Sequence, residues 1–171
     1  MQVRIIVVAI SVAKPHQFVL SDAPVATPAP GEVAIRVARA GICGSDIHIL
    51  HGSNPFAKYP RIIGHEVVGT IDAIGDGVES HRVGDRVVIE PVVACGHCCS
   101  CRHDRPNVCA HLEVIGVHRD GGFRERIAVP AGNAVSISGA IEDAVACLAE
   151  PLSIAANVLE RGPAFTPMTP S

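Results

Sequence analysis

The sequence predicts a mainly β domain, arranged as a barrel or a sandwich, with a few short helices. Runs rich in Val and Ile recur between Gly, Pro and Asp residues, which is the spacing of short strands joined by turns. Hydrophobic residues make up 48% of the chain, and they are mostly Ala, Val and Ile, with no Trp and one Tyr. Only three stretches carry apolar residues at helical spacing.

The predicted strands are, in chain order, VRIIVVAI (3–10), EVAIRVARA (32–40), EVVGTIDAIG (66–75), DRVVIEP (85–91) and RERIAVP (124–130). The first run resembles a signal peptide, because Arg4 precedes apolar residues and an SVA triplet, but cleavage after Ala13 would leave a leader below the usual length. We therefore favour a strand that ends at the turn Lys14-Pro15. The proline-rich stretch APVATPAPG (23–31) predicts an extended loop.

The predicted helices are SDIHIL (45–50), AIEDAVACLA (140–149) and LSIAANVLERG (152–162), so the strands end near residue 150. With 171 residues the chain can bury a core without disulfide bonds. Its net charge of −3 and lack of a basic run argue against nucleic acid or an anionic membrane as a partner. No apolar run approaches the roughly 18 residues that a membrane span needs.

Five of the seven cysteines lie between residues 95 and 109, in the stretch CGHCCSCRHDRPNVC. Disulfide bonds and metal binding are the two explanations, and the spacing C-x2-C-x2-C-x7-C favours metal. Four thiolates around a tetrahedral zinc would form a closed, structural site; the ligands are Cys95, Cys98, Cys101 and Cys109. We expect Cys99 to point away from the metal and Cys147 to act as a buried hydrophobe.

A second set of candidate ligands is spread over three motifs, GICGSDIH (41–48), GHE (64–66) and EP (150–151). One Cys, one His and an acidic residue from separate elements suit a catalytic zinc that keeps a position open for water or substrate. Each motif alone is a weak signal, because a His beside a Glu is usually a solvated or core residue.

Together, these motifs and the four-cysteine segment resemble the zinc-dependent medium-chain alcohol and polyol dehydrogenases over residues 14–160. The motifs GDRV (84–87) and DGGF (120–123) stand in the same order as in that family. GSNPFAKYPRIIGHE and GVHRDGGF look closest to the starvation-sensing protein B type and to the related sugar-acid 5-dehydrogenases. The resemblance implies a GroES-like β-barrel that carries a four-cysteine zinc lobe.

The resemblance also assigns roles to single residues. It makes Cys43 and His65 ligands of a catalytic zinc, and leaves open whether Glu66 or Glu150 is the carboxylate ligand. Asp46 would accept the free ring N–H of His65 and so orient it, the alternative being a helix N-cap. Ser45 and His48 match the family's proton relay, and Glu66, beside the zinc, is the third residue expected to be catalytic. His118 would line the substrate pocket or lie on a surface loop.

By the same resemblance, residues 1–151 form the catalytic domain, and residues 152–171 begin the helix that leads into a coenzyme-binding Rossmann domain. The sequence contains no G-x-G-x-x-G, so we expect that domain to be absent and this chain to be inactive by itself. The family implies two zinc ions, NAD(P) bound only with the Rossmann domain, and a secondary alcohol of a polyol or sugar acid as substrate. It also implies a homo-oligomeric full-length form. We expect the protein to be cytoplasmic, because thiolate zinc ligands must be free of disulfide pairing and no credible leader precedes the first strand. A non-enzymatic zinc module used for binding or assembly is the alternative.

Overall fold

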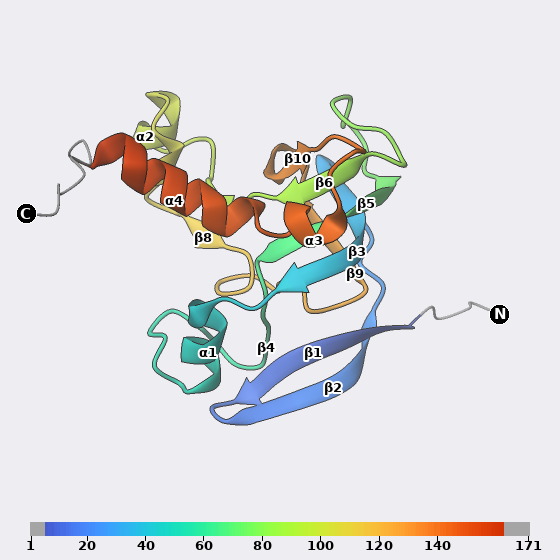
Figure 1. Cartoon of the computed structure of the whole chain (residues 1–171), viewed down its shortest axis with the longest axis vertical. Coiled ribbons are helices and arrows are strands. Elements are labelled where there is room, and N and C mark those ends of the chain that lie inside the picture. Colours follow the sequence, from blue (N-terminus) through green and yellow to red (C-terminus); the bar gives the residue numbers. More distant parts are fainter. Residues whose placement is uncertain (1–5, 163–171) are drawn as a thin grey trace, which may run out of the picture.

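A five-stranded antiparallel sheet forms the centre of the computed structural model, which describes residues 6–162. The strand order is β10-β6-β5-β3-β9. These strands are β3 (Glu32–Gly41), β5 (Glu66–Ile74), β6 (Arg86–Ile89), β9 (Arg126–Pro130) and β10 (Ala134–Ser136). Figure 1 shows that the sheet is strongly curled, as expected for part of a barrel wall.

A second sheet, in the order β2-β1-β4, lies against one end of the first. It consists of β1 (Ile6–Lys14), β2 (Gln17–Pro24) and β4 (Arg61–Ile62). The two sheets are joined where the backbone N–H of Ile10 donates to the carbonyl of Phe123, at 2.8 Å. The mainly β, barrel-like fold that the sequence predicts is thereby confirmed.

The main core lies inside the curl of the five-stranded sheet. It is built from β-branched side chains that are nearly or fully buried: Val33, Ile35, Val67, Ile71, Val87, Ile89, Ile115, Ile127 and Val129, with Ala134. A smaller core lies beneath α1 (Gly44–Leu50) and contains Val12, Ile49, Ile63 and Val117. Because the residues around position 64 join this smaller core to β5, the two cores together hold the loops that carry the candidate ligands.

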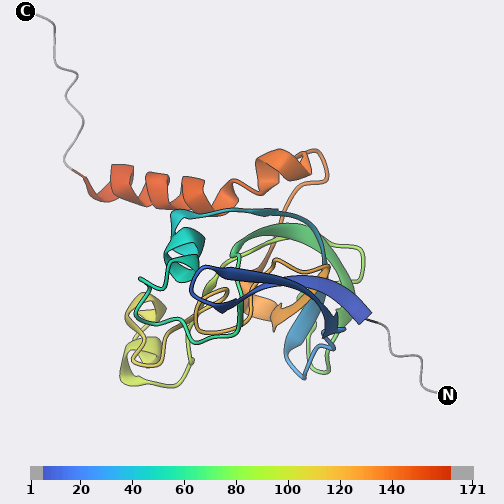
Figure 2. The same cartoon turned by 90° about the horizontal axis from the view of Figure 1, so that it is seen from below.

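A lobe projects from the barrel between two short paired strands, β7 (Val92–Val93) and β8 (Glu113–Val114). It contains α2 (Cys99–Arg102) and a 3-10 turn at Pro106–Val108. A second 3-10 turn, Ala131–Asn133, joins β9 to β10. The chain then enters α3 (Asp143–Ala146) and α4 (Ala149–Arg161), and α4 runs along the outside of the barrel (Figure 2).

All five predicted strands appear within the described residues, and the first of them, whose residues 3–5 lie outside that range, continues to Lys14 before the predicted turn. The sequence analysis missed β2, an edge strand whose side chains are mostly exposed and whose conformation depends on pairing with β1. The helix at 45–50 is confirmed by α1, whereas the run 140–149 was wrong in extent, since α3 covers only four of its residues.

The last helix begins at Ala149, three residues before the predicted start. Pro151 is tolerated there because the backbone N–H groups of the first helical turn have no acceptor within the helix, so a residue without an N–H loses no hydrogen bond. As a result, Glu150 lies in the first turn of α4, and the predicted domain boundary between residues 151 and 152 falls inside this helix.

Candidate metal centres

The four cysteines of the lobe converge on one point. Their sulfur atoms all lie within 4.8 Å of one another, with Cys98 Sγ at 3.5 Å from Cys101 Sγ and 3.9 Å from Cys109 Sγ. A disulfide would bring two sulfurs to about 2.05 Å. Tetrahedral zinc, with bonds of about 2.3 Å, separates its sulfur ligands by about 3.8 Å. All seven cysteines of the chain are unpaired, so the spacing fits a metal and not a disulfide.

Backbone N–H groups point at these sulfurs and favour their thiolate form. Cys109 Sγ accepts from the N–H of Cys95 and of His111, both at 3.3 Å, and these bonds lower the pKa of Cys109. The backbone N–H of Cys101 lowers the pKa of Cys98 to about 6. Desolvation and the neighbouring sulfurs raise the pKa of Cys101 to about 12. Four adjacent thiols cannot all lose their protons without a compensating cation, because the resulting thiolates would repel one another. A divalent ion would take the place of that proton.

The second set also converges, but on a more buried point. Cys43, His65 and Glu66 each offer an atom within 4.8 Å of the other two, and His65 and Glu66 are only 6% and 8% exposed. Pairing of β3 with β5 places Gly41 opposite Glu66. A Cβ at position 41 would collide with the Glu66 carboxylate, so the glycine of the GIC motif makes room for that carboxylate.

Asp46 ties the two ligand loops together through its backbone contacts. Its carboxylate accepts from the N–H of Cys43 at 2.9 Å and from the N–H of Gly64 at 3.0 Å. Cys43 itself is the N-cap of α1, and Asp46 closes a capping box from the third helical position. Asp46 Oδ1 lies 3.9 Å from His65 Nδ1, too far for the predicted hydrogen bond, and this buried nitrogen has no hydrogen-bond partner in the described part of the chain.

Glu150 lies outside the group of three, although it is close enough to be influenced by them. Burial raises its pKa, the charges of Glu66 and Glu90 raise it further, and His65 opposes the shift. The structure thus groups Glu66, and not Glu150, with Cys43 and His65. Which carboxylate binds an ion stays a prediction.

Ser45 and His48 both lie on α1, three residues apart and therefore on one face of the helix. Ser45 Oγ is buried and has no hydrogen-bond partner among residues 6–162. His48 is exposed, and its Nδ1 lies 3.0 Å from Ser53 Oγ, a contact that the sequence analysis missed. His118 is half-buried; its Nδ1 accepts from the N–H of Val114, and its ring lies 5.8 Å from that of Phe56.

The two remaining cysteines behave as predicted from their surroundings. Cys99 is exposed and lies apart from the four-sulfur group, with its Sγ 3.8 Å from His103 Nδ1. Cys147 is 8% exposed, and burial raises the pKa of its thiol. This thiol donates to the carbonyl of Glu66 at 3.2 Å, which links the end of α3 to β5, the strand that begins with the candidate ligand.

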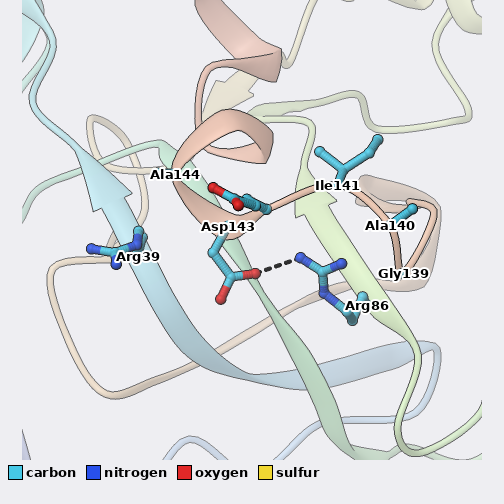
Figure 3. A pocket seen from close by; sticks show the side chains of 8 residues that line it. Arg39, Arg86, Gly139, Ala140, Ile141, Asp143 and Ala144 are labelled. Carbon is cyan, nitrogen blue, oxygen red and sulfur yellow. Dashed lines mark hydrogen bonds and ion pairs between the residues drawn. The ribbon is translucent and has the colours of Figure 1, made fainter.

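A surface pocket of about 490 Å³ lies apart from both centres, between the ends of β3 and β6 and the helix α3 (Figure 3). Arg39 and Arg86 line it, and Arg86 is paired with Asp143 at 2.5 Å and also donates to the carbonyl of Ser138. None of the candidate ligands lines this pocket, so its position does not mark the metal chemistry.

Comparison with known proteins agrees with this arrangement. Residues 29–139 match the model of the alcohol dehydrogenase GroES-like domain. Over 153 residues the chain is 56% identical to the starvation-sensing protein RspB of Escherichia coli K12, covering 90% of this chain and 45% of that protein. It is 38% identical to L-galactonate-5-dehydrogenase of the same organism, covering 86% of this chain and 43% of that enzyme.

A solved structure shows the same fold. The crystal structure of a short chain alcohol dehydrogenase (rspB) from E. coli CFT073, complexed with the cofactor NADH, superposes with a TM-score of 0.85 at 52% identity. The match covers 92% of this chain and 46% of that one. The chain therefore spans less than half the length of the relatives it matches. Among residues 6–162, no helix is both long enough and apolar enough to cross a membrane.

Proposed function

The chain belongs to the alcohol dehydrogenase GroES-like domain family, and we propose that it is the zinc-binding catalytic domain of an NAD(P)-dependent polyol or sugar-acid dehydrogenase. The observation that carries the proposal is the convergence of Cys43, His65 and Glu66, of which the last two are buried, with the buried hydroxyl of Ser45 two residues along the chain from Cys43. A thiolate, an imidazole and a carboxylate fit zinc, and three protein ligands leave a fourth position for a substrate. The closed four-cysteine lobe would hold a second, structural zinc.

The proposed reaction removes a hydride from a secondary alcohol carbon and a proton from its hydroxyl. Zinc, when bound, lowers the pKa of a hydroxyl group beside it. Ser45 would accept the hydroxyl proton and pass one to His48, whose exposure on α1 lets it release a proton to solvent. The hydride passes to the nicotinamide ring of NAD(P)+, which is reduced as the alcohol becomes a carbonyl.

Glu66 and Asp46 would support this chemistry in different ways. We propose Glu66 as a ligand, or as the carboxylate closest to the ion, because it lies with Cys43 and His65. Asp46 would fix the loops of Cys43 and His65 through their backbone, and its charge 3.9 Å from His65 Nδ1 would favour the tautomer that leaves Nε2 free to bind metal.

The coenzyme half of the proposal rests on the relatives and on α4. RspB-type and L-galactonate-5-dehydrogenase relatives are about twice as long as this chain. Within the described chain, α4 has no buried residue and exposes Leu152, Ile154, Val158 and Leu159. An apolar helix face of this kind calls for a partner surface. We propose that residues 152–171 begin the connection to a Rossmann domain, and that the full-length enzyme is a homo-oligomer located in the cytoplasm.

A chimera tests the proposed function. Residues 1–161 would be joined at α4 to the coenzyme-binding half of the E. coli relative, and the product screened with NAD+ and NADP+ against polyols and sugar acids. We expect oxidation of a secondary alcohol, lost on Cys43→Ser with the fold intact. Cys98→Ser should instead release the lobe zinc and lower stability, because structural zinc binding is largely folding free energy.

Two results would contradict the proposal. One is a zinc-loaded, folded chimera that oxidises none of these alcohols while the parent relative, tested in parallel, is active. The other is turnover that survives Cys43→Ser. Either result would favour the alternative, a zinc module used for binding or assembly.

A further inference from the structure

The thiol of Cys147 makes contacts that the proposed chemistry does not use. Cys147 ends α3, which lies against β3 and β5 (Figure 1), and it stands two residues before α4. Its thiol donates to the carbonyl of Glu66 at 3.2 Å. Burial raises the pKa of this thiol, the charge of Glu66 raises it further, and the backbone N–H of Gly41 opposes the shift by donating toward the sulfur. One buried side chain therefore contacts the backbone of both strands.

These two backbone groups belong to the last residue pair of the β3–β5 ladder. Gly41 lies opposite Glu66, and β3 ends where β5 begins, at this pair. Cys43 follows Gly41 by two residues, and His65 directly precedes Glu66. The end of a ladder opens more easily than its middle, because fewer neighbouring bonds hold it. A side chain that joins the strands at this pair therefore fixes the place from which the candidate ligands extend.

The simpler alternative is that Cys147 only fills space in the core. The apolar cluster around it consists of Val68, Ala146, Val88 and Ile137. An apolar side chain would also fill this place, but it could neither donate to the carbonyl of Glu66 nor accept from the N–H of Gly41. A thiol can do both, as a weak donor and a weak acceptor. The two roles predict different results for Ala and Ser at this position, because only Ser keeps the hydrogen-bonding groups.

We propose that Cys147 is a positioning residue, which joins the ends of β3 and β5 and so keeps Cys43, His65 and Glu66 within reach of one metal ion. This inference rests on the proposed function, because it takes these three side chains as the metal ligands. Asp46 holds the same loops from α1 through other backbone N–H groups. Cys147 supplies a second, independent support from the junction of α3 and α4.

The test compares Cys147→Ala with Cys147→Ser in the 171-residue chain. A mild chelator would remove the ion outside the lobe, Co²⁺ would replace it, and elemental analysis would check that the lobe keeps its zinc. The absorption bands of bound Co²⁺ report the geometry of its ligands. We expect Cys147→Ala to weaken Co²⁺ binding by about tenfold and to shift these bands, because loss of the groups that orient metal ligands costs about 10- to 100-fold. Cys147→Ser should restore part of the affinity.

Amide hydrogen exchange tests the same contact without Co²⁺. In the chain with zinc only in the lobe, the amide of Gly41 should exchange faster in Cys147→Ala than in the native chain, and Cys147→Ser should slow it again. Val88→Ala is the matched control, because it removes atoms from the same apolar cluster at a position that pairs with Val68 and not with Glu66. It should lower stability and leave the Co²⁺ bands unchanged.

The outcomes separate this inference from the proposed function. Native Co²⁺ affinity in Cys147→Ala, or equal losses in the Ala and Ser variants or in Val88→Ala, would overturn the role of Cys147 while the proposed function stands. A native chain that binds no Co²⁺ outside the lobe would instead contradict the proposed function. In that case the exchange rate of Gly41 still decides whether Cys147 joins the two strands.

Discussion

At the scale of single residues, the pKa of Glu150 is raised by its surroundings. Burial and the carboxylates of Glu66 and Glu90 disfavour its charged form, and His65 opposes this shift only in part. A carboxyl whose pKa is higher in the folded state contributes stability in its protonated form. That contribution is fully present below the ordinary value of 4.5 and is lost as the pH rises through the folded value.

We therefore expect Glu150→Gln to stabilise the zinc-free chain near neutral pH, because the amide keeps the shape of the side chain and removes its charge. The gain should shrink as the pH falls from neutral toward the ordinary carboxyl value of 4.5. Urea denaturation at several pH values measures this change. Glu160→Gln, in the exposed last part of the same helix, is the control and should have little effect at any pH. A destabilised Glu150→Gln variant at neutral pH would contradict the expectation.

Zinc content of the same variants addresses the carboxylate ligand. Because Glu66 lies with Cys43 and His65, Glu66→Gln should reduce retention of the second zinc more than Glu150→Gln does. The reverse order, measured by elemental analysis after dialysis, would identify Glu150 as the ligand instead.

At the scale of secondary-structure elements, the start of α1 holds the loops of the candidate ligands Cys43 and His65. Cys43 caps this helix, Ser45 and His48 lie on it, and Asp46 is 1% exposed while serving two backbone N–H groups from different loops. The helix has only seven residues, so it depends on these bonds and on the packing of Ile49 more than on its own propensity.

Asp46→Ala should lower the free energy of unfolding by about 1–3 kcal/mol, because it leaves the N–H groups of Cys43 and Gly64 without an acceptor in a buried place. Chemical denaturation of the zinc-free chain measures the change without any contribution from metal binding. Asp22→Ala, at an exposed position of β2, is the matched control and should stay within about 0.5 kcal/mol. Equal stability of the two variants would show that Asp46 does not hold these loops.

At the scale of the whole molecule, the barrel and the lobe carry the two groups of candidate metal ligands, and α4 exposes an apolar face. The sequence contains no G-x-G-x-x-G turn, the device by which a Rossmann domain seats a coenzyme pyrophosphate. Hydride transfer needs the substrate carbon and the nicotinamide held in reactive geometry, which can supply about 7 to 11 kcal/mol of the barrier.

We expect the zinc-loaded 171-residue chain to show neither micromolar NAD(P) binding nor steady turnover of a polyol or sugar acid. Calorimetric titration with NAD+ and NADP+, beside an oxidation screen, measures both. The chimera described above is the positive control, since it differs in having a coenzyme domain. Tight coenzyme binding by the chain alone would contradict this expectation and show that the barrel contains a coenzyme-binding site without a G-x-G-x-x-G motif.

The sequence by itself predicted the strands that build the core, because alternating β-branched residues between turns leave few other structures for β3, β5 and β9. It also predicted the four-cysteine cluster, since ligands so close in the chain converge through local turns alone. The pattern of apolar residues does not predict the edge strand β2, because most of its side chains are exposed and its conformation depends on pairing with β1.

Only the tertiary structure decided how the distant residues meet. The register of β3 on β5 brings Cys43 to His65 and Glu66, and the collision avoided at Gly41 explains why that carboxylate can face them. The earlier start of α4 places Glu150 near this group but outside it, and Asp46 proves to bind backbone N–H groups where a ring hydrogen bond was predicted. Local spacing determines local geometry, whereas contacts between separate elements depend on packing and register, which no short motif encodes.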